Sequence, residues 1–301
     1  MANLYRHAES NTRKTWLYLT GFLVLIIAIG WLISYLMDSF IILWIAVIFS
    51  VLMSFFSYWH SDKIILAMNR AKEIKKEDNP ELYRLVENLC ITAGLPLPKI
   101  YIIDEAQPNA FATGRDAKHG VVAVTRGLLE KLDRAELEGV IAHELSHIGN
   151  KDMLLQTIVV TLVGFIVILT NIFFRMAFWG GMGGRGRDAG QLRLILLLIA
   201  AALAVLAPLF ANLIKLAISR KREFLADASA GLLTRYPEGL ARALQKISQD
   251  PSPLRAANDA TAHLYIASPF RGKEKNSWLH KLFLTHPPTE QRIKALREMS
   301  V

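Results

Sequence analysis

The sequence His143-Glu144-Leu145-Ser146-His147 lies near the middle of the 301-residue chain, inside the apolar stretch 137–148 (LEGVIAHELSHI). On a helix, two histidines four residues apart share one face, where both imidazoles can bind the same zinc ion. Glu144 stands beside them, where a carboxylate can take a proton from a water molecule on that ion. The pattern predicts a zinc-dependent hydrolase, and the alternative is an ordinary helix with two structurally satisfied histidines.

The residues around this motif predict a small α+β unit. Asp133 and Glu136 have the spacing of a capping box, so the motif helix should begin there. Two segments rich in β-branched residues, 99–104 and 121–125, are expected to be strands, with a third at 109–113. Further helices are expected from Pro80 to a C-cap at Gly94, from Pro237 onward, and over 289–299.

The composition indicates a membrane protein. Hydrophobic residues make up 52% of the chain and the mean hydropathy is +0.29, which is too apolar for an ordinary soluble protein. The segments 16–37 and 41–59 are each long enough to cross a bilayer, and 61–76 is expected to be an amphipathic, basic connector. A second pair of spans is expected at roughly 154–178 and 192–214, which gives four spans in two hairpins.

The basic residues predict the orientation of these spans. Lysines and arginines precede the first span and follow the second and fourth, which places the soluble segments in the cytoplasm. Arg185, Arg187 and Arg193 disagree, because they lie in or beside the loop that should be outside. The second pair therefore either crosses the bilayer, which we favour, or forms a hairpin packed against protein.

The net charge of +9 is better explained by a membrane than by nucleic acid. Much of the positive excess lies beside apolar spans, where basic residues fix orientation and meet anionic lipid headgroups. Cys90 is the only cysteine and lies on the apolar face of a predicted helix, so no intrachain disulfide can form.

A catalytic zinc site needs a third protein ligand and an open position for water. Glu223 is the best candidate, because it shares a helical face with Asp227 four residues later in an apolar stretch. Asp227 is then expected to accept the other ring N–H of a ligating histidine. The alternative is an exposed glutamate that follows a cluster of interfacial basic residues.

These motifs resemble the membrane-integrated gluzincins, which include the HtpX-type proteases and the CaaX prenyl proteases. The resemblance covers most of the chain and rests on four segments, 143–147, 223–227, 109–112 and 285–288. The length and the expected four spans are closer to the HtpX type. A mainly α fold is implied, with four transmembrane helices in two hairpins and an α+β zincin-like catalytic domain with a small sheet.

The resemblance also implies roles for individual residues. One zinc ion per chain would be bound by His143, His147 and Glu223, with Glu144 as the catalytic acid and base and Asp227 behind the ligands. His286 would help to stabilise the oxyanion, although it could equally set the turn before the last helix. The segment Asn109, Ala110, Phe111, Ala112 would pair with the substrate backbone as an edge strand, or else be a plain strand with Phe111 in the core.

The expected organisation is a first hairpin over 1–60, catalytic segments over 61–153 and 217–301, and a second hairpin over 154–216. The expected function is cleavage of misfolded or damaged membrane proteins on the cytoplasmic side of the bacterial inner membrane, a stress-response task. The alternatives are a narrow processing protease for prenylated or lipidated substrates and a non-catalytic membrane scaffold held together by zinc. The partners are protein substrates and the lipid bilayer, without nucleic acid; the sequence does not predict an oligomeric state.

Overall fold

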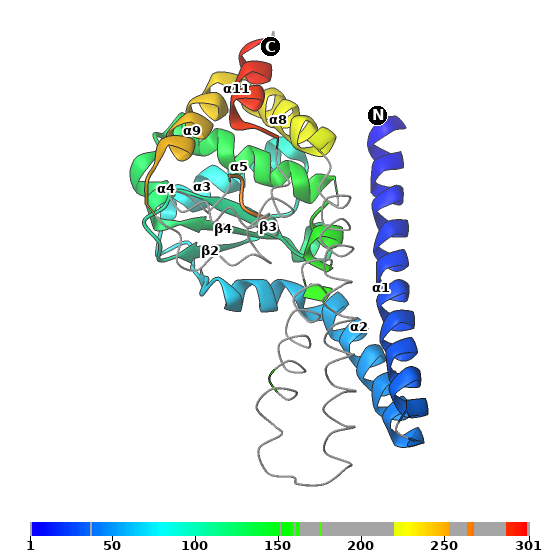
Figure 1. Ribbon diagram of the computed structural model, residues 1–301. Helices are drawn as coiled ribbons and strands as arrows, with labels where there is room; N and C mark the ends of the chain where they lie inside the picture. Colours follow the sequence, from blue (N-terminus) through cyan, green and yellow to red (C-terminus); the bar gives the residue numbers. More distant parts are fainter. Residues whose placement is uncertain are drawn as a thin grey trace.

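The computed structural model describes residues 2–36, 38–150, 152–158, 161–162, 175, 220–252, 264–267 and 287–299. A long helical hairpin projects from a globular part in which helices surround a small sheet (Figure 1). The elements are α1 (Ala2–Leu36), α2 (Phe40–Met68), β1 (Lys72–Glu73), α3 (Pro80–Ala93), β2 (Lys99–Ile103), β3 (Ala110–Thr113), η1 (Ala117–His119), β4 (Val121–Thr125), α4 (Arg126–Lys131), α5 (Arg134–Gly149), α8 (Arg220–Thr234), α9 (Pro237–Gln249) and α11 (Thr289–Arg297).

The hairpin of α1 and α2 agrees with the first predicted pair of spans. Both helices are long and apolar enough to cross a membrane, over Arg13–Leu32 in α1 and throughout α2. They turn at Asp38, whose φ of 49° is the left-handed conformation that aspartate tolerates better than most residues. Gly30 lets the helices approach closely, because a Cβ added there would lie 2.2 Å from the Cβ of Ala46.

The expected amphipathic connector over 61–76 starts as a continuation of α2, which ends at Met68. Ile65 and Leu66 are buried against the sheet, and this burial stabilises the extra turns of helix. The helix then ends where Arg70 adopts a φ of 53° and the Ala71 N–H donates to the Leu66 carbonyl at 2.9 Å, a Schellman-type ending.

The sheet is mixed and has four strands in the order β1-β2-β4-β3. Strands β2 and β4 are parallel, whereas β1 and β3 are antiparallel to their neighbours. The three predicted strands are confirmed as β2, β3 and β4. The two-residue β1 was not predicted, since two residues carry no readable alternation.

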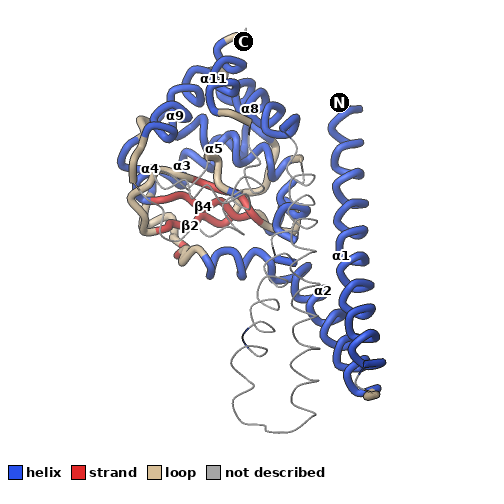
Figure 2. The backbone as a smooth tube through the Cα atoms, viewed as in Figure 1, coloured by secondary structure: helices blue, strands red, loops and turns tan. Residues whose placement is uncertain are grey.

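Each face of the sheet packs on a different part of the chain (Figure 2). The main core, which includes Ala110 and Ala112 of β3, lies between one face and the helices α3, α5, α8 and α9. Phe111 points to the other face, where it meets the end of α2 and Tyr265. The sheet therefore lies between the motif helix and the end of the membrane hairpin.

The motif helix α5 is fixed at its start and along its side. The predicted capping box is present: the Glu136 N–H donates to Asp133 and the Asp133 N–H donates to Glu136, each at 2.9 Å. Gly139 allows α9 to approach, because a Cβ there would lie 2.7 Å from the backbone nitrogen of Leu240. The predicted helices α3 and α9 are also confirmed, and Gly94 caps α3 with a φ of 66°.

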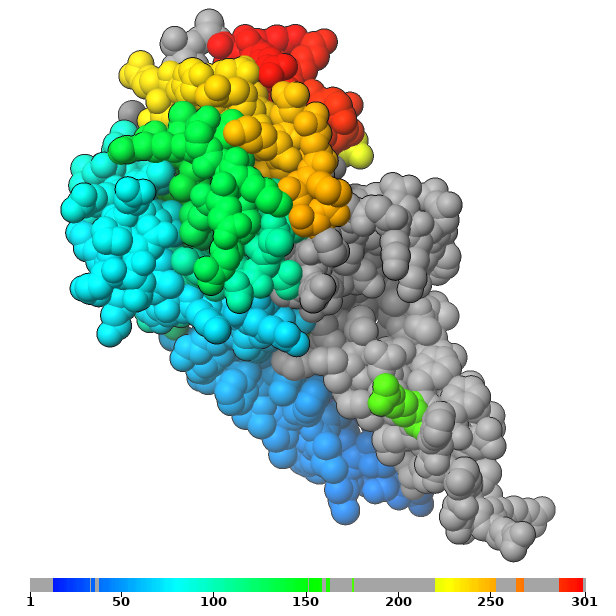
Figure 3. Space-filling view, turned by 90° about the vertical axis from the view of Figure 1, so that its left-hand side faces the viewer, coloured from blue at the N-terminus to red at the C-terminus, as the bar shows by residue number. Residues whose placement is uncertain are grey.

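The second predicted hairpin lies almost entirely outside the described residues. Residues 152–158 are helical and follow α5 directly, as expected for the start of a third span. Among the described residues only α1 and α2 meet the requirements for a membrane span, so the prediction of four spans is not confirmed. In the space-filling view the blue surface of the hairpin extends below the cyan and green surface of the globular part (Figure 3).

Candidate metal centre

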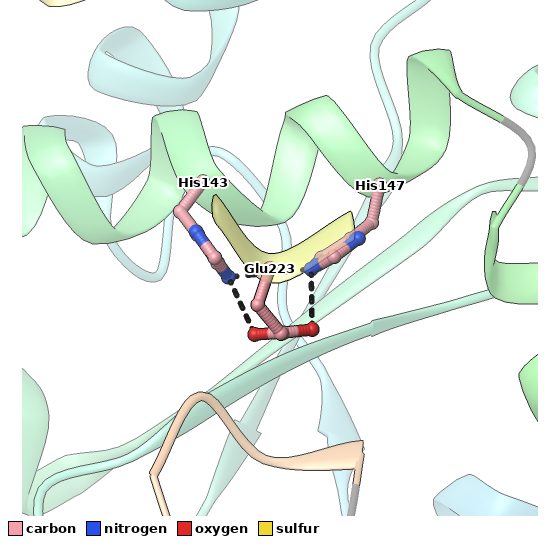
Figure 4. Close-up of side chains that lie close together, drawn as sticks. All are labelled: His143, His147 and Glu223. Carbon is pink, nitrogen blue, oxygen red and sulfur yellow. Dashed lines mark hydrogen bonds and ion pairs between the residues drawn. The ribbon is translucent and has the colours of Figure 1, made fainter. Parts of the chain in front are cut away.

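Three predicted ligands meet inside the globular part. His143 and His147 project from one face of α5, and Glu223 approaches them from α8 (Figure 4). The two Nε2 atoms lie 3.2 Å apart, and the Glu223 carboxylate oxygens lie 3.7 Å from His143 Nε2 and 3.6 Å from His147 Nε2. All three residues are buried. These atoms can hold a metal ion.

The distances and the charges both fit a zinc ion. Tetrahedral zinc with bonds of about 2.0–2.1 Å holds its ligand atoms about 3.3 Å apart, close to the separations observed here. Among the described residues no fourth histidine, cysteine or carboxylate joins this cluster, which leaves one coordination position open. With both histidines neutral, as metal binding requires, and Glu144 ionised, buried carboxylates outnumber buried guanidinium groups around the site by two, so a divalent cation would balance the charge. The groups are Glu144, Asp152, Glu223 and Asp227 against Arg222 and Arg292.

Asp227 and Arg292 fix the orientation of the His143 ring from its Nδ1 side. His143 Nδ1 lies 2.9 Å from Asp227 Oδ1, which fixes Nε2 toward the site. Arg292, from α11, donates to both Asp227 oxygens at 2.7 and 2.8 Å. Burial opposes ionisation of Asp227, but the guanidinium outweighs it and lowers the pKa of this carboxyl to about 2. Asp227 is therefore anionic at neutral pH and can orient the imidazole.

Asp152 plays the same part for His147. Its Oδ2 lies 3.4 Å from His147 Nδ1, and its Oδ1 lies 3.5 Å from Arg222 Nε. Burial lowers the pKa of His147, but the surrounding carboxylates, Asp152 first and then Glu223, raise it to about 9. Burial is the main cause that lowers the pKa of His143. His147 therefore lies in a negative environment that attracts a cation.

Glu144 is turned toward the sheet. It is 2% exposed, and the backbone of Ala112 on β3 hydrogen-bonds to it. Burial is the main cause that raises the pKa of Glu144 to about 7, and the nearby Glu223 carboxylate adds to it. A carboxyl group with a pKa near neutrality can both accept and return a proton.

The segment 109–112 lies at the edge of the sheet, as expected, but part of it is already paired within the chain. The Ile266 N–H donates to the Ala110 carbonyl at 3.0 Å. The Asn109 side chain is buried and donates to the Ala267 carbonyl at 2.9 Å, and Phe111 packs in the core. Of the four residues, only Ala112 directs a backbone group toward Glu144.

Two functional candidates were missed from the sequence, and one prediction cannot be compared. The sequence predicted only a helix over 289–299 around Arg292. In the structure Arg292 is buried and binds Asp227, which lies 65 residues earlier in the chain, so it belongs to the centre. Asp152 was overlooked, although a carboxylate five residues after His147 is a usable signal. His286 lies outside the described residues.

Comparison with known proteins identifies the family of the chain. Residues 76–300 match the family described as Peptidase family M48. A protein named Protease HtpX homolog from Dictyoglomus thermophilum is 47% identical over 297 residues, covering 98% of this chain and 94% of the relative. A protein of the same name from Pyrococcus furiosus is 47% identical over 286 residues, covering 94% of this chain and 93% of the relative.

A solved structure shares the fold. The crystal structure of S. mikatae Ste24p is similar over 98% of this chain and 67% of that chain, with a TM-score of 0.51 and 19% sequence identity. The match to the family covers most of the chain and includes all three candidate ligands. The chain therefore belongs to peptidase family M48 and is a metalloprotease.

Proposed function

We propose that the protein is a zinc-dependent endopeptidase that cleaves proteins in or beside a membrane. The observation that carries this proposal is the buried convergence of His143, His147 and Glu223, with Glu144 beside them. A structural zinc site usually has four protein ligands, so the open position favours catalysis over a scaffold role. The apolar α1 and α2 support attachment to a membrane.

The chemistry is the addition of water to a peptide carbonyl. When bound, a zinc ion in this donor set acidifies a water molecule and polarises the carbonyl. Glu144 takes the proton from the attacking water and transfers it to the leaving amine as the C–N bond breaks. Its raised pKa suits this exchange near neutral pH.

The surrounding residues act through the ligands. Asp227 and Asp152 accept the ring N–H groups at Nδ1 and keep both Nε2 atoms free as donors to the metal. Arg292 keeps Asp227 charged and in place through its two hydrogen bonds. Arg292 is thus a positioning residue.

Substrate backbone would pair beside Ala112, next to Glu144. The contacts of Asn109 and Ala110 with residues 266–267 restrict pairing at the other end of β3. We infer that these two residues shape the wall of the substrate groove, whereas Phe111 supports it from the core.

The biological role proposed is quality control of misfolded or damaged membrane proteins at the cytoplasmic side of the inner membrane. The basic residues that flank the first hairpin support this orientation. The relatives named Protease HtpX homolog support protease activity. A second hairpin over 154–216 remains part of this proposal and would make the protein multi-pass.

The test compares wild type with Glu144→Gln in detergent. Zinc content is measured by elemental analysis, and cleavage is measured on casein and on a membrane-protein substrate. We expect one zinc per chain in both proteins and a loss of cleavage of roughly 10²–10⁴-fold in the variant. Equal cleavage by the two proteins would exclude Glu144 as the base, and zinc without cleavage in wild type would favour the scaffold. A peptide-library profile then separates broad from narrow specificity.

A further inference from the structure

A cavity lies between α2 and the loop that contains η1, away from the metal centre. Its volume is ≈ 470 Å³. It is lined by Phe55, Trp59, His60, Asp62, Lys63, Arg115 and His119. None of these residues has a part in the proposed peptide hydrolysis, so the peptidase chemistry does not account for the cavity.

Aromatic pairs show at which level of the hairpin this cavity lies. Trp16 of α1 stacks on Tyr58 of α2 with ring centroids 5.8 Å apart, and Trp31 stacks on Tyr35 at 6.1 Å. Trp16 and Tyr35 are separated by roughly 28 Å of helix, given a rise of 1.5 Å per residue. This separation matches the thickness of a bilayer's hydrocarbon core, whose boundaries attract tryptophan and tyrosine. Trp59 follows Tyr58, so the cavity lies at one membrane boundary.

The lining of the cavity changes from apolar to basic at this boundary. Phe55 and Trp59 are 56% and 43% exposed, on the part of α2 that would face lipid. The polar residues Asp62 and Lys63 follow one turn later. A molecule that fits this lining has an apolar part and a polar part, as a phospholipid does.

Arg115 is held in position over the aromatic side. Its guanidinium lies 4.5 Å from the centroid of the Trp59 ring, within the range of a cation–π interaction. It donates to His119 Nε2 at 2.7 Å, and His119 Nδ1 lies 2.7 Å from the Asp116 carboxylate. This chain of contacts orients the guanidinium before any ligand arrives.

The charges of the lining suit a phosphodiester. Lys63 and Arg115 outnumber the single carboxylate of the lining, Asp62, by one positive charge. Asp116 lies outside the lining, and its oxygens accept from the His119 backbone N–H and contact the Arg115 and His119 side chains. A phosphodiester carries one negative charge and accepts well from guanidinium and ammonium groups.

We propose that this cavity binds a membrane phospholipid, with its phosphate at Arg115 and Lys63 and its acyl chains against Phe55 and Trp59. The proposal is independent of the peptidase chemistry. A lipid seated here would contact both the membrane hairpin and the loop that follows β3, and so would fix the catalytic part against the bilayer.

The test measures lipid binding to the full-length protein in detergent. Native mass spectrometry gives the affinity for phosphatidylglycerol of wild type, Arg115→Gln, Lys63→Gln and Lys118→Gln. Lys118 is a matched control, because it is an exposed lysine of η1 outside the lining. We expect one tight site in wild type and Lys118→Gln, weakened about fivefold in each lining variant, since one basic residue near a lipid surface contributes about that much.

Thermal unfolding with added phosphatidylglycerol provides the second readout. The lipid should raise the unfolding temperature of wild type and Lys118→Gln, but much less that of Arg115→Gln. Equal lipid affinity in all four proteins would overturn the proposal. Equal protection by inorganic phosphate would overturn it as well, because the site would then bind free phosphate and not lipid.

Discussion

The helices α5 and α2 pack on opposite faces of one sheet, yet they differ in which side chains they bury and which they expose. α5 buries His143 and Glu144, which are 1% and 2% exposed. α2 buries Ser50 and Ser57 completely and leaves Phe40 77% exposed. Over residues 40–59 of α2, small polar groups face inward and large apolar side chains face outward.

This difference indicates that α5 is surrounded by a water-soluble protein interior, whereas α2 is suited to a lipid environment. In water, buried histidines and carboxylates persist only when other groups compensate them, as Asp227 and Arg292 do for His143. In lipid, large apolar side chains are stable on the outside, and small residues such as serine and glycine permit close helix packing. The metal centre therefore depends on a charge network, and the hairpin depends on close contact.

The largest effect is expected from removing a ligand. Glu223→Gln keeps the shape of the side chain but removes its charge from the centre. Zinc affinity should fall by more than about 100-fold, because the loss of a residue that only hydrogen-bonds a metal ligand already lowers the affinity by up to about 100-fold. Cleavage should fall with the zinc affinity. Zinc titration against a chelator measures this, with Glu290→Gln, an exposed position of α11, as the control. Retained zinc affinity would show that the centre does not need this carboxylate.

A smaller but still large effect is expected at Arg292. Arg292→Met leaves the buried Asp227 carboxylate without its two hydrogen bonds, so zinc affinity should fall by about 10–100-fold. Arg292→Lys keeps the charge without the paired geometry and should recover part of the loss. If both variants bind zinc as tightly as wild type, Arg292 has no positioning role.

Close helix packing should be sensitive to a single added methyl group, both at the contact of α5 with α9 and in the hairpin of α1 and α2. Gly139→Ala and Gly30→Ala each place a Cβ within 2.7 Å of a neighbouring atom, whereas Gly21→Ala meets nothing within 4 Å. Overpacking should cost about 1–3 kcal/mol at the first two positions, despite the better helix propensity of alanine. The midpoint of thermal unfolding in detergent measures this. A fall in the Gly21→Ala variant as large as the others would contradict the packing explanation.

The smallest effects are expected at the helix starts. Asp133 caps α5 with a side-chain hydrogen bond, whereas Ser39 at the start of α2 makes none. Asp133→Ala should therefore destabilise the protein by about 1 kcal/mol, and Ser39→Ala should be nearly neutral. The same unfolding measurement separates the two, and equal effects would mean that the capping box adds nothing to α5.

Local signals explain which parts of the fold could be predicted from the sequence. The capping box at Asp133, the αL cap at Gly94 and the β-branched runs of β2 and β4 act over a few residues, so they can be read directly. Glu223 and Asp227 were also found locally, because their spacing follows one helical turn. In the structure both carboxylates lie beside His143.

Long-range contacts explain what could not be predicted. Arg292 is paired with a residue far away in the chain, and nothing in its own helix separates it from an exposed arginine. The extension of α2 depends on Ile65 and Leu66 packing on the sheet, which is a tertiary contact. The pairing of Ile266 with Ala110 likewise comes from a segment without periodicity, so the partial closure of the β3 edge was missed.

Zinc K-edge X-ray absorption of the purified wild-type protein identifies the atoms that bind the metal. We expect one zinc with two imidazole nitrogens at about 2.0–2.1 Å, oxygen ligands at about 2.0–2.2 Å from Glu223 and solvent, and no sulfur. A sulfur ligand at about 2.3 Å, or a spectrum without imidazole scattering, would contradict a centre formed by His143, His147 and Glu223.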